Sequence, residues 1–274
     1  TLVNEMMPVL QGRDLEVGIA RYQQAIASIK ADQEAYQLFE EAERAVADDD
    51  LEIAMLNLDE AISMVPNEAR FSGLKADILL YQGSYRGSIV IYNEAIEKDD
   101  SYFDYYLGRG VAYARTGNQV LAQTDLERSV DLLPTATAMN ELGKISLNNN
   151  DRIVAKQYFQ AAAGGAGQVA SEASLAFTRL DIVDTPGSYV QAQTYTDGEG
   201  RIIARVTNRS GLVLQNIQLE FTAVIAEQLA ERLINIGSLA INQTIDVNSD
   251  LRFPEGIEGS SNQMRVRVNS AQPQ

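Results

Sequence analysis

The densest group of side chains suited to binding a ligand is a run of aromatic residues around one carboxylate, Tyr102-Phe103-Asp104-Tyr105-Tyr106. Neighbouring positions of a helix point about 100° apart, so these four rings cannot all face one core. We expect Tyr106 to belong to the core, and Tyr102, Phe103 and Tyr105 to pack between helix pairs or to lie at a surface. Exposed aromatic rings beside an acid are typical anchors of a protein-binding site.

The residue types that the chain lacks exclude several classes of enzyme. The absence of His and Cys excludes an HExxH zinc site, a Ser-His-Asp triad, a thiolate nucleophile and a cysteine-bound metal cluster. Two carboxylates suffice for a glycosidase, but the many acids of this chain single out no pair. The Gly-rich stretch at 164–167 lacks the Lys and Ser/Thr of a phosphate-binding loop. We therefore expect this chain to be non-catalytic, with no metal and no cofactor.

One acidic run, Asp48-Asp49-Asp50, invites comparison with a calcium-binding loop. Such a loop needs spaced oxygen ligands, a central Gly and a terminal Glu, whereas Leu51 follows directly here. The run therefore predicts a solvated turn that caps the next helix.

The charge of the chain limits its partners. The 274 residues include 38 acidic and 22 basic side chains, a net charge of −16. Residues 1–184 carry −14 of this charge, from 29 acids and 15 bases, and residues 185–274 carry only −2. Such a protein is a poor partner for nucleic acid or an anionic membrane, and no apolar run approaches the ~20 residues of a membrane span. We expect a protein or peptide partner that is neutral to basic.

The elements that position these residues follow an internal repeat. The strings LDEAISMVP, YNEAIEKDD and LERSVDLLP begin at Leu58, Tyr92 and Leu126, a spacing of 34 residues. A fourth copy follows at a spacing of 33, with Gly143 and Phe159 in phase. The pattern resembles the tetratricopeptide repeat, a helix–turn–helix unit of 34 residues with small residues where its helices cross. The resemblance implies an α-solenoid, because one hairpin cannot bury its own apolar face.

The resemblance also implies where a partner binds, since the first helix of each repeat lines the concave face of such solenoids. The implied groove is mixed in character and lacks the Lys and Asn set with which chaperone-binding relatives hold a C-terminal carboxylate. An extended or helical peptide is the general expectation. The peptide-binding residues that we predict are Tyr36, Phe39, Glu43, Arg70, Asp77, Tyr81, Asp104, Leu107, Arg115, Asn140 and Lys144.

The ends of the array are less regular than its centre. Clear repeats cover about 35–166, and the stretch 15–29 predicts the second helix of a degenerate N-terminal repeat, after a weak first helix at about 2–10. A closing helix is predicted at about 169–183, with Leu175, Leu180 and Val183 as its apolar contacts. The solenoid domain would therefore comprise residues 1–184.

The pattern changes near Asp184, where strict alternation of apolar and polar residues begins. Ile217, Leu219 and Phe221 share one face of a predicted strand, and six or seven short strands separated by polar turns predict a small antiparallel β-sandwich over 185–274. The string IIARVTNRSGLVLQNIQLEF is similar to bacterial immunoglobulin-like or FxLYD-like accessory domains. Asn208-Arg209-Ser210 within it also fits the short glycosylation pattern.

A longer stretch suggests a biological setting. The strings YYLGRG and DLERSVDLLPTA, followed by a β-rich tail, look like the C-terminal region of bacterial periplasmic zinc metalloproteases of the β-barrel-assembly-enhancing type. That resemblance implies a periplasmic protein, with a cytoplasmic one as the alternative, and a catalytic domain located before Thr1.

Three functions remain open on the sequence. The first is an interaction module that binds a polypeptide in the solenoid groove without catalysis. The second is the substrate-recognition or regulatory portion of such a metalloprotease. The third is a structural subunit that assembles with itself.

Overall fold

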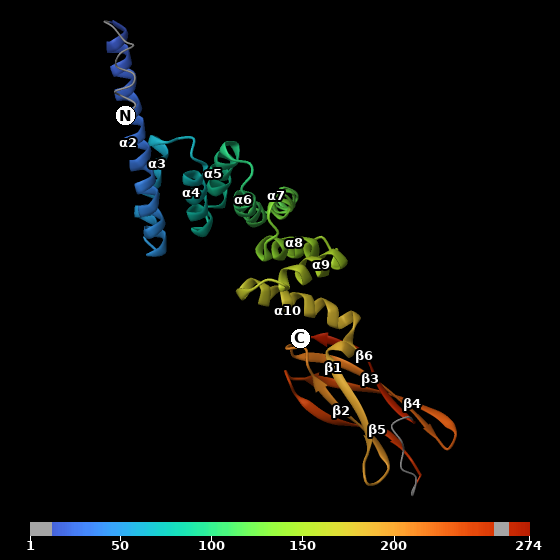
Figure 1. Ribbon diagram of the computed structural model, residues 1–274. Helices are drawn as coiled ribbons and strands as arrows, with labels where there is room; N and C mark the ends of the chain where they lie inside the picture. Colours follow the sequence, from blue (N-terminus) through green and yellow to red (C-terminus); the bar gives the residue numbers. More distant parts are fainter. Residues whose placement is uncertain (1–12, 255–262) are drawn as a thin grey trace. The chain divides into compact units, whose positions relative to one another are not determined.

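In the computed structural model, the residues described are 13–254 and 263–274. These residues form nine α-helices followed by six β-strands (Figure 1). The chain divides into two compact units, Thr1–Pro134 and Thr135–Gln274. The element order confirms the predicted fold class, an array of tetratricopeptide-type helix hairpins followed by a small antiparallel β-sandwich. Within these residues, no helix has both the length and the apolar character that crossing a bilayer requires.

The first unit contains three helix hairpins, each made of a first and a second helix. Its helices are α2 (Arg13–Ala47), α3 (Leu51–Met64), α4 (Ala69–Tyr81), α5 (Tyr85–Lys98), α6 (Phe103–Arg115) and α7 (Gln119–Leu132). The turns of the three hairpins contain Asp49, Gly83 and Gly117 with positive φ angles of 61°, 77° and 85°, a conformation that Gly adopts without strain. The carboxylate of Asp50 accepts a hydrogen bond from the Ile53 backbone N–H at 3.2 Å, which confirms the predicted turn and helix cap.

The hairpins are held together by small residues that face large ones. Ala42 and Leu58 are fully buried in one core cluster, and Ala76 and Tyr92 in the next. At Gly110 an added Cβ atom would lie 2.9 Å from the side chain of Leu126, closer than atoms tolerate. The small residue at this repeat position therefore sets how closely the two helices approach, and the large one fills the space beside it.

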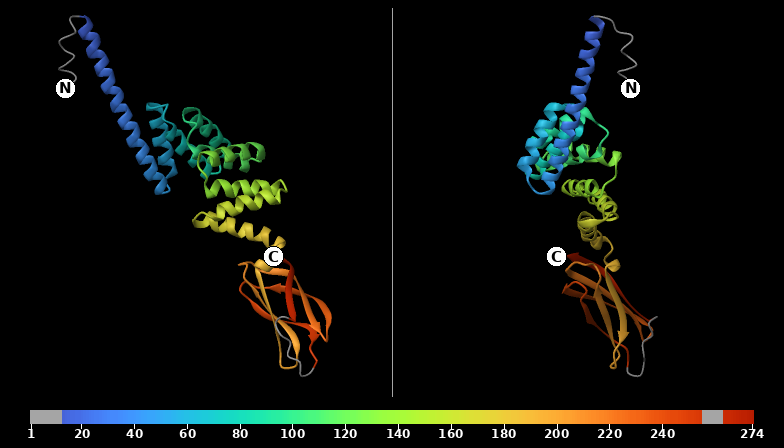
Figure 2. Two further views of the ribbon diagram at one scale, coloured as in Figure 1. Left: turned by 45° about the vertical axis from the view of Figure 1, so that its right-hand side comes forward. Right: turned by 60° about the vertical axis from the view of Figure 1, so that its left-hand side comes forward.

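The first helix of the array differs from the prediction. We expected a break between a helix at 15–29 and the helix that begins near residue 35, but α2 continues through this stretch for 35 residues (Figures 1 and 2). The segment 30–34, Lys-Ala-Asp-Gln-Glu, contains neither Gly nor Pro, and most of its residues favour a helix. The weak helix predicted at 2–10 lies outside the described residues.

The second unit begins with three helices, α8 (Ala136–Asn148), α9 (Arg152–Ala163) and α10 (Gly167–Asp184). Gly143 of α8 faces Phe159 of α9 in the same small-against-large arrangement. Helix α10 covers the stretch predicted for the closing helix, but its buried residues are Ala170, Ala173 and Ile182. The predicted contacts were wrong in part, because Leu175 and Val183 are exposed. Small residues again allow the close approach between helices.

Two three-stranded antiparallel sheets form the sandwich of the second unit. One sheet has the order β1-β2-β5 and the other β4-β3-β6. The short helix η1 (Pro186–Ser188) joins α10 to the first strand. The strands are β1 (Val190–Thr196), β2 (Arg201–Asn208), β3 (Leu214–Ile225), β4 (Gln228–Leu239), β5 (Thr244–Arg252) and β6 (Met264–Pro273). As predicted, Ile217, Leu219 and Phe221 point into the core.

One buried polar residue organises the corner of the sandwich. The side-chain amide of Asn208 donates to the backbone carbonyls of Leu212, Leu239 and Ala240 at 2.7, 3.1 and 3.0 Å. Its carbonyl oxygen accepts from the backbone N–H and the hydroxyl of Ser210. Asn208 is fully buried, so the side chain in this glycosylation-like sequence is a structural hub.

Candidate functional site

The predicted binding residues of the first unit lie on its first helices, α2, α4 and α6, and we call this region the first-helix surface. At its N-terminal end, Tyr36 and Phe39 of α2 meet Arg70 of α4. The Arg70 guanidinium lies 5.4 Å from the ring centre of Tyr36 and 5.7 Å from that of Phe39. Both rings also pack against the buried Phe71, at centre distances of 5.4 and 5.1 Å. The structure therefore brings three of the predicted residues into one cluster.

A residue that we did not predict completes this cluster. The hydroxyl of Tyr36 donates to the carboxylate of Glu68, and Arg70 Nε donates to the same group at 3.2 Å. Partial burial alone would raise the pKa of Glu68, but these hydrogen bonds outweigh it and the pKa is lowered. Glu68 also caps α4 by accepting from the Arg70 backbone N–H. Its position directly before a predicted helix was the sequence feature that could have identified Glu68, because acids at that position stabilise the helix N-terminus.

The centre of the first-helix surface carries two carboxylates from neighbouring hairpins, Asp77 of α4 and Asp104 of α6. The hydroxyl of the buried Tyr92 donates to Asp77 Oδ1 at 2.5 Å. Within the described chain, neither carboxylate forms an ion pair with a basic side chain. These two charges are therefore available to a partner.

The electrostatic environment of this pair favours a positive neighbour. Asp77 retains access to solvent, but the protein packed around it removes its carboxylate from bulk water and raises its pKa to about 6. The hydrogen bond from Tyr92 opposes this rise, and the charge of Asp104 adds to it. Partial burial also raises the pKa of Asp104. A cation between the two groups would stabilise both ionised forms.

The aromatic run beside Asp104 follows the prediction only in part: Tyr105 packs between two hairpins as expected, whereas Tyr106 is not the core residue. Tyr105 is the buried ring, and an added Cβ atom at Gly73 of α4 would lie 2.4 Å from it. Tyr106, which we expected in the core, is only half-buried, and the guanidinium groups of Arg109 and Arg128 lie over its ring. The space that Gly73 leaves open on α4 explains why the neighbouring ring is the buried one.

One ring of this run remains accessible. Tyr102 is 45% exposed, and its ring centre lies 5.3 Å from that of Phe103 and 4.9 Å from that of Tyr105. Because Phe103 and Tyr105 support its ring, Tyr102 has the geometry of an anchor for an apolar or cationic side chain.

The remaining predicted residues are scattered. Tyr81 is 76% exposed at the end of α4, Glu43 and Arg115 are exposed, and Leu107 is half-buried. The other two predicted residues, Asn140 and Lys144, belong to the second unit. Asn140 is 3% exposed, so its predicted place on an accessible face was wrong. Lys144 is exposed and pairs with Glu141 at 2.6 Å.

Polar pairs between adjacent repeats were also missed. Lys75 Nζ lies 2.5 Å from Asp59 Oδ1, and Arg109 Nη1 lies 2.7 Å from Asn93 Oδ1. Each pair joins the second helix of one hairpin to the first helix of the next, and the two pairs are 34 residues apart along the chain. Arg109 also forms two 2.7 Å bonds with the buried Asp125 of α7. The 34-residue period itself was the signal that would have found the first two pairs.

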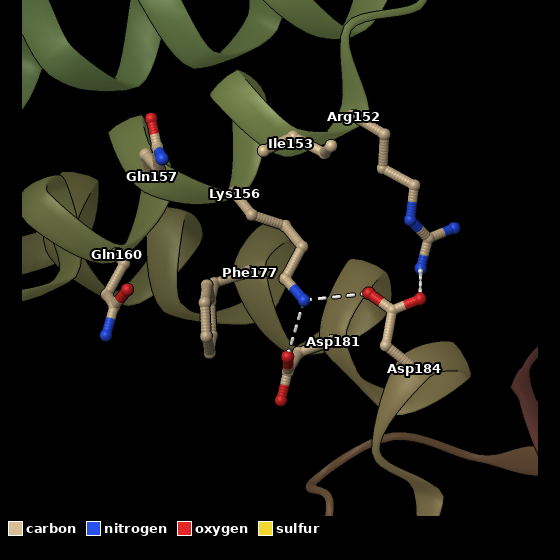
Figure 3. Close-up of a pocket in the computed structure, with 8 residues that line it drawn as sticks. All are labelled: Arg152, Ile153, Lys156, Gln157, Gln160, Phe177, Asp181 and Asp184. Carbon is tan, nitrogen blue, oxygen red and sulfur yellow. Dashed lines mark hydrogen bonds and ion pairs between the residues drawn. The ribbon is translucent and has the colours of Figure 1, made fainter.

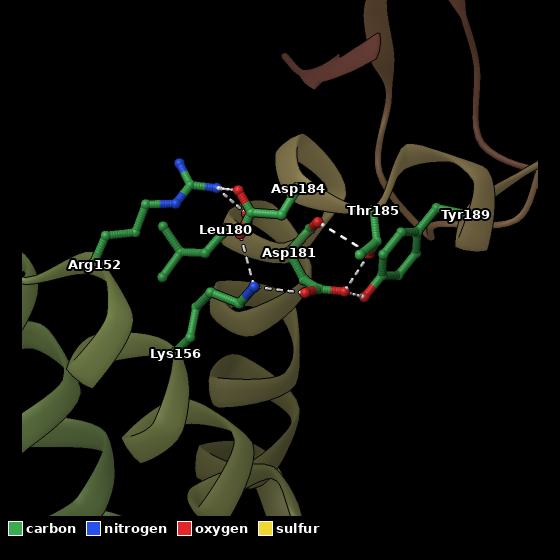
Figure 4. A network of polar contacts seen from close by, with 7 residues as sticks. All are labelled: Arg152, Lys156, Leu180, Asp181, Asp184, Thr185 and Tyr189. Atoms are coloured by element: carbon green, nitrogen blue, oxygen red, sulfur yellow. Dashed lines mark hydrogen bonds and ion pairs between the residues drawn. The ribbon is translucent and has the colours of Figure 1, made fainter. Parts of the chain in front are cut away.

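The second unit has a shallow pocket of about 500 Å³ between α9 and α10 (Figure 3). Lys156 lies at its centre and bonds to Asp181 at 2.6 Å and to Asp184 at 2.8 Å. The hydroxyls of Thr185 and Tyr189 donate to the other oxygen of Asp181 at 2.8 and 2.9 Å (Figure 4). Arg152 also donates to the Leu180 carbonyl and to Asp184 (Figure 4).

The charged groups of this pocket are engaged with one another. Hydrogen bonds from Lys156, Thr185 and Tyr189 outweigh the effect of partial burial and lower the pKa of Asp181. Hydrogen bonding to Asp181 and Asp184 raises the pKa of Lys156, which keeps its amine protonated and therefore not nucleophilic. The network fixes the end of α10 to α9 and to the start of the sandwich.

Comparison with known proteins identifies the repeat. Residues 76–117 match the family model for the TPR repeat. The match thus identifies residues 76–117 as similar to a tetratricopeptide repeat. Nothing in the matches supports a metalloprotease origin. A search of curated proteins found no match.

Several solved structures are similar to part of this chain. The first TPR of Spaghetti (RPAP3), bound to the HSP90 peptide SRMEEVD, is 23% identical, with 43% of this chain and 98% of that chain covered and a TM-score of 0.42. MamA from Desulfovibrio magneticus RS-1 is 15% identical, with coverage of 57% and 88% and a TM-score of 0.49. A tetratricopeptide repeat protein from Parabacteroides merdae is 17% identical, with coverage of 54% and 60% and a TM-score of 0.47.

Proposed function

We propose that this chain is a non-catalytic protein-interaction module that binds a polypeptide segment carrying a basic side chain on the first-helix surface. One observation carries the proposal: the carboxylates of Asp77 and Asp104, which form no ion pair within the described residues, share this surface with the exposed ring of Tyr102. The surface thus offers charge and aromatic area that the internal packing does not use. A tetratricopeptide repeat at residues 76–117 supplies the kind of scaffold on which such a surface serves binding.

A basic segment fits the charge of the first unit. Residues 1–134 contain 24 acidic and 11 basic side chains, a net charge of −13, and residues 135–274 carry the remaining −3. A Lys or Arg side chain between Asp77 and Asp104 would form charge-assisted hydrogen bonds and relieve the repulsion between the two acids. The field of the whole unit would also speed the encounter with a cationic segment.

The ends of the same surface give the segment further contacts. Arg70 is held over Tyr36 and Phe39 by Glu68, so this end presents a fixed cation and two rings. Tyr81 presents an exposed ring at the end of α4. We propose that these groups bind acidic or apolar side chains on either side of the basic one, which would give the segment a direction on the surface.

The experiment is a selection of peptides followed by a charge-matched comparison. Peptides selected from a random displayed library with the full chain are expected to be enriched in Lys and Arg. Binding of a selected peptide, measured by fluorescence anisotropy, should weaken at least tenfold in Asp77→Asn/Asp104→Asn, because charge-assisted hydrogen bonds are lost. The amide oxygen that this variant places at position 77 would still accept the Tyr92 hydroxyl bond, so the fold is retained.

The control removes the same charge elsewhere. Glu94→Gln/Glu97→Gln makes an equal change on exposed positions of α5, a second helix, and should alter the affinity less than twofold. Equal weakening in the two double variants would reduce the effect to net charge and contradict the proposed site. Unchanged binding in Tyr81→Ala/Leu107→Ala would show that the peptide does not contact these two residues of the first-helix surface.

A further inference from the structure

The N-terminal half of α2 carries an apolar stripe that the described helices of the first unit do not bury. Ile19, Tyr22, Ile26 and Ile29 follow one another at spacings of three, four and three residues, and they are 46, 51, 37 and 57% exposed. This spacing places all four on one face of the helix. No side chain from 16 to 34 is buried, and among the helices at 51–132 none lies beside this half of α2 (Figures 1 and 2).

The stripe is distinct from the face that holds α2 in the array. The C-terminal half of α2 packs on α3 through Ala35, Ala42 and Ala45. Ala35 lies nine residues after Ile26, about 2.5 helical turns, so the two residues point to opposite sides of the helix. The apolar stripe is therefore not a continuation of the core between α2 and α3, and α3 cannot bury it.

We infer that this stripe is a self-association surface, on which residues 16–32 of α2 pair antiparallel with the same residues of a second copy of the chain. In a pair centred on Gln24, Ile19 lies opposite Ile29 of the second copy, and Tyr22 lies opposite Ile26 of the second copy. Each large ring thus meets an aliphatic side chain, and every residue of the stripe is covered. The 3-4-3 spacing is the one that lets two helices interlock side chains in this way.

The charges that flank the stripe complement one another in this arrangement. Glu16 lies beside Lys30 of the second copy, and the two-fold symmetry repeats this ion pair at the other end. Ala25 meets its own counterpart near the centre, where a small residue permits close approach. Residues 16–32 carry two basic and two acidic side chains, so this is a neutral part of a unit whose net charge is −13.

The net charge of the first unit selects the antiparallel orientation. A parallel pair would place the two acidic helix arrays side by side at one end of the coil. In the antiparallel pair, the two Ala35 residues at which the arrays begin are separated by about 33 Å along the helix axis. This distance is several times the Debye length of about 8 Å at physiological ionic strength, so the repulsion between the arrays is screened.

The first experiment measures the mass and the orientation of the full chain. Sedimentation equilibrium should give a dimer that Ile26→Asp converts to a monomer, while Val17→Asp, on the opposite face of the same helix, leaves the dimer intact. Because the chain has no Cys, single spin labels can be placed at Gln24→Cys or Val17→Cys. The distance between labels should be longer at 17 than at 24, since the antiparallel pair offsets the 17 positions by about 21 Å along the axis.

A charge exchange tests the register. Glu16→Lys and Lys30→Glu should each weaken dimerisation about tenfold, since each converts two attractive pairs into repulsive ones. The double variant Glu16→Lys/Lys30→Glu should restore it. Glu97→Lys on α5 makes the same change in net charge as Glu16→Lys and should not weaken the dimer. A chain that stays monomeric at all concentrations, equal label distances at 17 and 24, or a double variant as weak as the single ones would overturn the inference.

Discussion

The helix hairpins and the β-sandwich use polar side chains in contrasting ways. In the sandwich, the buried Asn208 satisfies three backbone carbonyls and two groups of Ser210. In the hairpins of the first unit, the carboxylate of Asp77 accepts one hydrogen bond from the Tyr92 hydroxyl and pairs with no basic side chain of the described residues. The polar side chain that holds the strands together has its hydrogen-bonding capacity filled. The one on the first-helix surface keeps part of that capacity free.

The difference indicates which polar positions the fold constrains and which ones are free to serve in binding. A buried amide whose two N–H groups and carbonyl oxygen are all engaged cannot be replaced without leaving buried backbone groups unpaired. The hairpins depend instead on the fit of small against large residues, which leaves the polar positions of their first helices less constrained. The comparison predicts a graded series of effects, largest at Asn208, intermediate at a helix crossing and smallest at Asp77.

The largest effect is expected for Asn208→Ala. This change removes the side-chain donor of the Leu239 and Ala240 carbonyls and leaves the Leu212 carbonyl with only the Ser210 hydroxyl, and we expect the sandwich to lose about 3 kcal/mol or more. Hydrogen exchange should accelerate in β2 and in residues 238–243, while the helices of the first unit keep their protection. Asn208→Asp, which keeps the acceptor for Ser210 but loses the donors, should be nearly as unstable.

An exposed residue of the same type provides the control for this prediction. Asn235 on β4 makes one side-chain contact, with Gln218 at 3.3 Å. Asn235→Ala should change the stability of the sandwich by less than about 0.5 kcal/mol. Similar losses for the two variants would mean that Asn208 is not a hub.

An intermediate effect is expected for Gly143→Ala at a helix crossing. The new methyl group would lie 2.7 Å from the buried ring of Phe159. Overpacking costs about 1–3 kcal/mol, and the higher helix propensity of Ala returns about 1 kcal/mol, so a net loss of about 1–2 kcal/mol is expected in chemical unfolding. The hairpin α8–α9 should show this loss as faster hydrogen exchange.

The repeat itself offers the rescue for this variant. In the first hairpin, Ala42 and Leu58 occupy the repeat positions of Gly143 and Phe159. Ala is larger than Gly there, and Leu is smaller than Phe. Gly143→Ala/Phe159→Leu recreates that combination, so it should be more stable than the sum of the two single changes predicts. Strict additivity would contradict the view that the two positions are fitted to one another.

These two regions also differ in how much the sequence reveals. The hairpins were predictable because Ala42, Ala76, Gly110 and Gly143 recur at nearly constant spacing, and only small residues fit at those crossings. Strand β3 was also predictable, because its alternation of apolar and polar residues indicates one buried face. The role of Asn208 was not, because its partners lie up to 32 residues away along the chain. A sequence pattern carries no trace of such contacts.

The first-helix surface, our candidate binding site, was only partly predictable. Repeat positions identified Tyr36, Phe39 and Arg70, which the structure brings together, and Asp77 and Asp104, whose charges interact. The prediction from repeat positions was wrong at Asn140, which is buried. It was also wrong in assigning Tyr106 rather than Tyr105 to the core. Which of two adjacent rings is buried depends on a space on the opposite helix, at Gly73, and not on its own repeat position.

The length of α2 was missed because a helix that crosses a repeat boundary leaves no break in the pattern.

The smallest effect in the series concerns the pH dependence of Asp77. The pKa of this group is about 6 in the folded chain and about 4 in an unfolded one, so the folded state holds the proton more tightly. The contribution of Asp77 to the free energy of unfolding is therefore fully present below about pH 4 and is lost as the pH rises through about 6. Because Asp77 has access to solvent, we expect this loss to stay below about 1 kcal/mol.

The difference between Asp77→Asn and the unchanged chain isolates this contribution. Urea unfolding should give the two proteins equal stability at pH 4, and the variant should become the more stable one by pH 7. The carboxyl signal of Asp77 in an NMR titration gives the pKa directly. Asp104→Asn should lower it by removing a neighbouring negative charge, and Tyr92→Phe should raise it by removing the hydrogen bond that favours the ionised form. A pKa near 4 that responds to neither change would show that Asp77 is an ordinary surface acid, and the contrast with Asn208 would then say nothing about binding.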